Sequence, residues 1–159
     1  MVLASLFAAL TAVCAWLSIP MPPLSFTLQT FAIFLTLGVL GGKWGSVSVL
    51  LYLLLGLLGL PVFSGFRGGA GALLDATGGF LWGFAAGVLV YWALERFGKL
   101  PAMIGFQLVC YGCGCWWFHL YSGSIGAAVM TCVVPYLIPD GIKLWLAYSL
   151  SKRLRKHIT

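Results

Sequence analysis

An acid and a base three residues apart open the last strongly apolar stretch of the sequence. Asp140 and Lys143 follow Pro139 in a segment that is apolar enough to enter a bilayer. Residues at i and i+3 share one face of a helix, so the two charges can neutralise each other or be satisfied together by a ligand. Because ionisable residues within membrane helices are costly, they usually mark a functional site. The pair therefore predicts a binding site, and a structural ion pair between two helices is the alternative.

The composition of the chain indicates what must position these two residues. It is 62% hydrophobic and 8% charged, with a mean hydropathy of +1.05 over 159 residues, which is the composition of an integral membrane protein. We expect one transmembrane domain over residues 1–159. Since about 20 apolar residues span a bilayer, the expected class is an all-α protein with a compact bundle of six transmembrane helices. The hydrophobic blocks are 2–19, 28–41, 45–60, 78–95, 101–120 and 124–150.

Prolines divide the last block. Pro135 and Pro139 lie four residues apart, too close for one undisturbed helix. We expect an outer-face segment over 124–134 and a span from about 139 to 152 that has Pro139 in its first turn. A single long, kinked helix is the alternative.

The positive charges predict the orientation. Most Lys and Arg residues fall on one set of predicted connections: Lys43, Arg96, Lys99, Lys152, Arg153, Arg155 and Lys156. This positive-inside bias places both termini in the cytoplasm and the protein in the cytoplasmic membrane. No basic soluble face is available for nucleic acid, and no phosphate-binding loop motif is present. Any energy for transport must come from an ion gradient or from a partner.

Polar residues gather on the predicted outer side. Thr27 and Gln29 begin the second hydrophobic block and are candidates for neutral hydrogen bonds to a ligand, although Thr27 can equally cap a helix. The loop from 59 to 79 carries Arg67, Asp75 and Thr77 among seven glycines. Such glycine density permits sharp turns, and a loop of this length is typical of a lid. The alternative is an idle, disordered loop.

Arg67 is the cation of this outer loop. A guanidinium is suited to a bidentate grip on a carboxylate, and a lipid headgroup or Asp75 are the other partners that we consider. Aromatic residues can supply walls for an apolar ligand body or an interfacial belt, and these are Phe63, Phe80, Tyr52, Trp82 and Tyr136. The predicted site suits a small amphipathic metabolite with a carboxylate and an amide-like end.

Two further patterns have a structural and a functional interpretation. Ala4, Ala8 and Ala12 place small residues on one helix face, which allows close helix packing within the chain or against a membrane partner. Cys115 and His119 share a face beside other cysteines. Because zinc sites usually use two well-spaced ligand pairs, we interpret these cysteines as packing residues and expect no metal site.

Four motifs in order resemble the BioY biotin transporters, which are substrate-binding (S) components of energy-coupling factor (ECF) transporters, and the resemblance covers essentially the whole chain. The motifs are Ser25-Phe26-Thr27-Leu28-Gln29-Thr30, Tyr52-x-x-x-Gly56-x-x-Gly59-x-Pro61-Val62-Phe63, Thr77-Gly78-Gly79-Phe80-Leu81-x-Gly83-Phe84 and Pro139-Asp140-Gly141-Ile142-Lys143. The family often has Gly-Pro before Thr-Gly-Gly, whereas Asp75 and Ala76 stand there in this chain.

The resemblance implies a six-helix bundle that binds biotin near the outer face. It implies that Asp140 accepts N–H bonds from the ureido ring. Lys143 would bond the ureido oxygen or compensate the acid, and Arg67 would hold the valerate carboxylate, although these two roles can be exchanged. A transmembrane coupling subunit and a pair of ATPases would complete the transporter, and the face of Ala4, Ala8 and Ala12 is similar to the family's docking surface. No catalysis and no cofactor are implied.

Three other functions are compared with this one. A self-sufficient secondary transporter predicts an internal repeat and a relay of ionisable residues in mid-membrane, and we find neither convincingly. An S component for thiamine or riboflavin would keep the fold and change the pocket. A membrane-embedded enzyme would rely on the cysteines and His119, and the sequence gives it little support.

Overall fold

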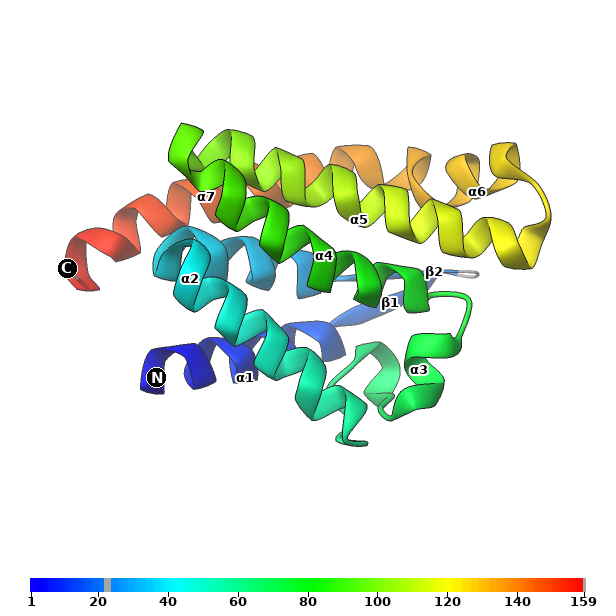
Figure 1. The fold of residues 1–159 in the computed structure, drawn as a ribbon, viewed down its shortest axis with the longest axis horizontal. Helices are drawn as coiled ribbons and strands as arrows, with labels where there is room; N and C mark the ends of the chain where they lie inside the picture. The colour runs from blue at the N-terminus through cyan, green and yellow to red at the C-terminus, as the bar shows by residue number, and fades with distance from the viewer. Residues whose placement is uncertain (22–23, 159) are drawn as a thin grey trace.

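The structure, a computed structural model, describes residues 1–21 and 24–158. Helices account for most of the described residues (Figure 1). The elements are α1 (Val2–Trp16), β1 (Ser18–Met21), β2 (Leu24–Thr27), α2 (Gln29–Leu57), the 3-10 turn η1 (Ser64–Phe66), α3 (Ala70–Leu74), α4 (Gly78–Leu94), η2 (Glu95–Phe97), α5 (Lys99–Ser122), α6 (Ile125–Cys132), η3 (Val134–Tyr136) and α7 (Leu137–Ile158).

Glycine at position 41 divides α2 into two helices. Gly41 has φ 76° and ψ 179°, a conformation outside the helical region and one that glycine adopts at little cost. The chain reverses there, and the second half packs so closely on the first that a Cβ at Gly45 would lie 3.0 Å from the Cα of Leu37. Glu95 Oε2 accepts a 2.6 Å hydrogen bond from the backbone N–H of Gly42, one of the donors left unpaired at a helix start.

The described residues therefore contain the six expected long helices: α1, the two halves of α2, α4, α5 and α7. The all-helical prediction is confirmed, with most boundaries shifted by one to three residues. By length and composition alone, three described helical stretches could cross a membrane: Gly78–Phe97, and the stretches Gln29–Leu57 and Ile125–Lys156, which are interrupted at Gly41 and at η3. Helix α1 is apolar but shorter. The start of α1 and the end of α7 lie at the same end of the molecule (Figure 1).

The proline division of the last hydrophobic block is also confirmed. Helix α6 ends at Cys132, η3 contains Pro135, and α7 begins at Leu137 with Pro139 in its first turn. Proline is tolerated there because the first N–H groups of a helix have no partner within it. This turn places Asp140 and Lys143 on the first two turns of α7, at the end of the bundle that also carries the hairpin and α3 (Figure 1).

Two elements were not expected from the sequence. Residues on either side of the first outer loop form an antiparallel hairpin, in which Ser18 pairs with Thr27 and Ile19 pairs with Phe26. Pro22 and Pro23 of this proline-rich loop lie outside the described residues. Thr27 ends β2 and does not cap α2, whose N-cap residue is Leu28 without a side-chain cap. The capping alternative for Thr27 is therefore wrong.

The glycine-rich loop is folded in the structure. It contains η1, α3 and a bridge between Phe63 and Arg67. Helix α1 holds it from outside, since the Trp16 indole N–H donates to the Pro61 carbonyl at 2.8 Å and the Trp16 ring stacks on Phe66 at 5.2 Å. The interpretation as an idle, disordered loop does not fit these contacts.

The alanine face of α1 is covered within the chain. Ala4, Ala8 and Ala12 are all buried, and the Ser48 hydroxyl of α2 donates a 2.7 Å hydrogen bond to the Ala4 carbonyl. Small side chains permit this close approach of two helices. The internal-packing alternative is the one that the structure shows, and the exposed docking face expected at these three residues is absent from the isolated chain.

Candidate functional site: a pocket with a charged pair at its buried end

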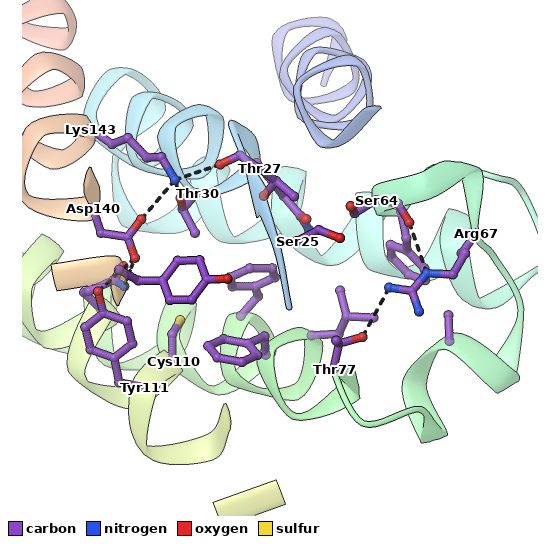
Figure 2. A pocket seen from close by; sticks show the side chains of 18 residues that line it. Ser25, Thr27, Thr30, Ser64, Arg67, Thr77, Cys110, Tyr111, Asp140 and Lys143 are labelled. Atoms are coloured by element: carbon purple, nitrogen blue, oxygen red, sulfur yellow. Dashed lines mark hydrogen bonds and ion pairs between the residues drawn. The ribbon is translucent and has the colours of Figure 1, made fainter. Parts of the chain in front are cut away.

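Asp140 and Lys143 form a buried ion pair. The Lys143 ammonium lies 3.0 Å from Asp140 Oδ1, and each residue is only 6% exposed. Both face into the bundle from α7 (Figure 2). A pair so well shielded from water costs several kcal/mol in desolvation, so it is stable only when further groups satisfy both charges.

Lys143 has three more partners, which come from β2 and α2. Its ammonium donates to the Thr27 carbonyl at 2.7 Å and to the Thr30 hydroxyl at 3.2 Å. It also lies 3.9 Å from the centre of the Phe26 ring, a favourable cation–π position. With the bond to Asp140, these contacts use the three N–H donors of the ammonium.

Asp140 is held from α5. Its second oxygen, Oδ2, accepts from the Gln107 amide nitrogen at 3.0 Å and from the Tyr111 hydroxyl at 2.8 Å. A carboxylate offers about four acceptor positions, and three are occupied by Lys143, Gln107 and Tyr111. Among the described residues, these partners leave one acceptor position of Asp140 for a ligand.

These residues close one end of a cavity that is partly open to the outside. Figure 2 shows Asp140 and Lys143 on one side of it and Arg67 on the other. Aromatic rings and small apolar groups form the walls between them. The lining residues are Ser25, Thr27, Gln29, Thr30, Phe63, Ser64, Arg67, Ala72, Thr77, Phe80, Leu81, Phe84, Gln107, Cys110, Tyr111, Tyr136, Asp140 and Lys143.

The glycine-rich loop contributes Ser64, Arg67 and Thr77 to the outer end of the pocket. The Arg67 guanidinium pairs with Asp75, donates to the Thr77 hydroxyl at 3.2 Å and donates from Nε to the Ser64 carbonyl at 3.1 Å. The side chains of Arg67 and Asp75 are 42% and 48% exposed. The pairing with Asp75, which the sequence left as an alternative role for Arg67, is present, and the exposure of both side chains leaves the guanidinium accessible to a ligand.

Eight of the nine predicted ligand residues line the cavity: Asp140, Lys143, Arg67, Gln29, Thr27, Thr77, Phe63 and Phe80. Tyr52 does not. Its ring is fully buried behind the wall, where its hydroxyl accepts from the Gln29 amide at 2.9 Å and donates to the Val62 carbonyl at 3.1 Å. Tyr52 therefore positions Gln29 and the loop. Trp82 is half exposed on α4 and lies outside the lining.

Two glycines make room for aromatic rings in the pocket wall. Phe63 rests on Gly56, where an added Cβ would come within 2.1 Å of its ring. Phe80 rests on Gly114, where the corresponding distance is 2.6 Å. Any larger residue at either position would displace the ring into the cavity.

From the sequence, Gln107 was considered only as one of the side chains able to make an amide contact with the ligand, and four other polar lining residues were not identified as site residues: Tyr111, Thr30, Ser25 and Ser64. Tyr111 and Gln107 are four residues apart on α5, a spacing that puts both on one helix face, and a glutamine within an apolar helix was the available signal. The sequence did not single out Thr30, Ser25 or Ser64, because hydroxyl residues are common near turns and helix starts.

The described residues contain no group of three or more His, Cys, Asp or Glu side chains that could hold a metal ion. Cys115 instead donates to the Ala128 carbonyl at 3.8 Å, and both Cys132 and Cys110 are buried. Cys115 and Cys132 pack between α5 and α6, and Cys110 packs against Gly83 of α4 and lines the cavity.

The pocket can bind a ligand but offers little for catalysis. Its charged groups are already neutralised in pairs, and its walls suit an apolar body with a polar group at each end. Together with the helical membrane architecture, this defines the class of protein as a membrane-embedded binding component for a small amphipathic solute.

The comparisons with known proteins identify the family within that class. The model of the BioY family matches residues 1–159. The chain is 41% identical to the biotin transporter BioY of Thermotoga maritima, over 96% of this chain and 94% of that protein. It is 38% identical to a probable biotin transporter BioY of Pyrococcus horikoshii, over the same shares of the two chains. The chain belongs to the BioY family.

A solved structure also matches the fold. The crystal structure of the S-component for biotin from an ECF-type ABC transporter superposes with a TM-score of 0.87 at 26% identity, over 96% of this chain and 88% of that chain. The arrangement of helices around the pocket is therefore that of an S component.

Proposed function

We propose that this protein binds biotin and serves as the substrate-binding S component of an ECF-type biotin transporter in the cytoplasmic membrane. It is a transport component and not an enzyme, as the family to which it belongs implies. The observation that carries the proposal is the pocket itself, which has a buried donor and acceptor set at one end and an accessible guanidinium at the other.

Biotin has a polar group at each end that matches these two regions. Its ureido ring carries two N–H donors and one oxygen acceptor, and such a unit must find partners for all of them when it is buried. The buried end offers the Asp140 carboxylate as acceptor and the Lys143 ammonium as donor, whose 3.2 Å bond to the Thr30 hydroxyl would give way to the ureido oxygen. The bicyclic body and valerate chain would lie along the walls formed by Phe63, Phe80 and Phe84.

The carboxylate of biotin is assigned to Arg67. Lys143 is surrounded by Asp140, Thr27, Thr30 and the Phe26 ring, which leaves no room for a bidentate contact with a second carboxylate. Arg67 has a planar fork that suits a carboxylate, and its partner Asp75 is half exposed. Of the two exchangeable roles, Lys143 therefore takes the ureido end and Arg67 takes the valerate end. Gln29, Thr27 and Thr77 would add neutral contacts.

The energy for uptake would come from partners. The sequence has no phosphate-binding loop motif, and we propose that a transmembrane coupling subunit and ATPase subunits bind this chain, which acts as a single domain. We place both termini in the cytoplasm, because the basic residues of the predicted inner connections follow the positive-inside rule. The alanine face of α1 is internal, so the coupling subunit would contact other surfaces.

Equilibrium binding to the purified protein in nanodiscs tests the proposal. Biotin should bind tightly and without turnover, and neither thiamine nor riboflavin should compete. A folded protein that does not bind biotin would overturn the assignment, and competition by thiamine or riboflavin would redirect it to another vitamin. Trp82→Leu changes a half-exposed residue outside the pocket and is the matched control.

A further inference from the structure

We propose that Gln107 is a specificity-determining residue whose amide oxygen accepts one N–H of the biotin ureido ring. This inference rests on the proposed function, since it assigns one contact within the same pocket. Gln107 lies on α5, is 9% exposed and lines the cavity beside Asp140.

The amide oxygen of Gln107 is buried and has no hydrogen-bond partner among the described residues. Leaving a buried acceptor unpaired costs free energy, because the acceptor has lost its water partners and gained no replacement. Most such atoms in folded proteins therefore have a partner, and an exception needs an explanation. A ligand that fills the cavity supplies that explanation, because the side chain to which the oxygen belongs lines it.

The hydrogen bond to Asp140 fixes the orientation of the Gln107 side-chain amide, so that its oxygen is the atom without a described partner. The Gln107 nitrogen donates to Asp140 Oδ2 at 3.0 Å, and a flipped amide would bring its oxygen against the carboxylate instead. Two acceptors facing each other repel, whereas an N–H beside a carboxylate is a charge-assisted hydrogen bond. The flipped orientation is thus excluded, and Gln107 presents an acceptor in addition to the one that remains on Asp140.

The buried end of the pocket then offers two acceptors and one cationic donor. The acceptors are Asp140 and Gln107, and the donor is Lys143. A cyclic urea has the complementary set, with two N–H donors on either side of one carbonyl oxygen. With only Asp140, one ureido N–H would be buried without a partner, so Gln107 completes recognition of the ring.

The affinities of several ligands for wild-type protein and two variants test this contact. Biotin and its two isomers methylated on either ureido nitrogen are titrated against wild-type protein, Gln107→Ala and Gln107→Met. Alanine leaves room for a methyl group, and methionine keeps the side-chain volume without an acceptor. The thermal unfolding temperature of each variant, measured on the same samples, reports whether its fold is intact.

We expect Gln107→Ala and Gln107→Met to lose roughly 10- to 100-fold in affinity for biotin, the range for leaving one buried hydrogen-bonding group unpaired. One methylated isomer should bind wild type at least roughly 10-fold worse than biotin, yet bind Gln107→Ala about as well as biotin does. The other isomer should be rejected by all three proteins.

Equal discrimination against both isomers in wild type and Gln107→Ala would overturn the inference, and so would unchanged biotin affinity in Gln107→Met. These results would show that the amide oxygen plays a structural part and does not contact the ligand. Both require that wild-type protein binds biotin. A wild type that does not bind biotin defeats the proposed function instead, so the two failures are distinguishable.

Discussion

The two ends of the pocket hold their charges in opposite ways. At the buried end, Asp140 and Lys143 are each 6% exposed, and their partners come from β2, α2 and α5 as well as from α7. At the outer end, Arg67 and Asp75 are nearly half exposed, and the described partners of Arg67 lie between residues 64 and 77 of one loop. The first region depends on the packing of the whole bundle, and the second depends on one loop.

This difference indicates how each end can act on a ligand. An exposed ion pair contributes about 0–1 kcal/mol, so a ligand carboxylate can replace Asp75 at Arg67 at little cost. Removing one partner of a buried pair costs about 3–5 kcal/mol, so the buried end cannot rearrange in that way. We therefore expect the buried end to be preorganised for recognition and the outer end to exchange partners when the ligand binds.

The largest effect is expected from Asp140→Asn. The change leaves the Lys143 ammonium buried without its counter-charge and removes an acceptor for the ureido ring. Biotin affinity should fall at least roughly 100-fold, as measured by equilibrium titration, and the thermal unfolding temperature should fall as well.

The double variant Asp140→Leu with Lys143→Met separates binding from stability. It should regain part of the lost stability, because a buried pair can often be replaced by apolar residues, and it should not regain binding. If Asp140→Asn binds biotin within a few-fold of wild type, the pair is only structural.

Arg67→Gln should have the next largest effect. It removes the cation assigned to the valerate carboxylate, so biotin affinity should fall roughly 10- to 100-fold. Biotinamide lacks that carboxylate and should bind the variant and the wild type nearly alike. A similar loss for biotin and biotinamide would instead indicate that Arg67 holds the loop.

Tyr52→Phe tests whether the two ends of the pocket are coupled through the Tyr52 hydroxyl. Its hydroxyl links Gln29 at the start of α2 to Val62 in the outer loop. Losing these hydrogen bonds should destabilise the protein by about 1 kcal/mol and weaken biotin binding by a few-fold, as measured by thermal unfolding and titration of the same samples. A variant with full stability but no binding would place the hydroxyl in contact with the ligand.

Asp75→Asn should have the smallest effect and the opposite sign. It weakens the competition for Arg67, so biotin affinity should rise by a few-fold, and the gain should be absent for biotinamide. The effect should also shrink at high ionic strength, because exposed charges are screened. Weaker binding of biotin would show that Asp75 orients Arg67 for the ligand and does not compete with it.

Much of the fold could be predicted from the sequence. Hydrophobic block length and the spacing of Pro135 and Pro139 indicated the six long helices and the start of α7, because bilayer thickness and proline geometry act locally. The hairpin was missed, since its strands are four residues long and lie beside a proline-rich turn. The small-residue face of α1 indicated close packing, but only the fold shows that its partner is α2.

The sequence by itself determined that Asp140 and Lys143 share a helix face at the start of an apolar segment, and that Arg67 stands on a glycine-rich outer loop. Only the tertiary structure decided that Gln107 and Tyr111 hold Asp140, that Thr27 and Thr30 hold Lys143, and that Tyr52 lies behind the pocket wall. The reason is physical. Charge, hydropathy and turn chemistry act over a few neighbouring residues, whereas the partners of a buried charge are set by how distant helices pack.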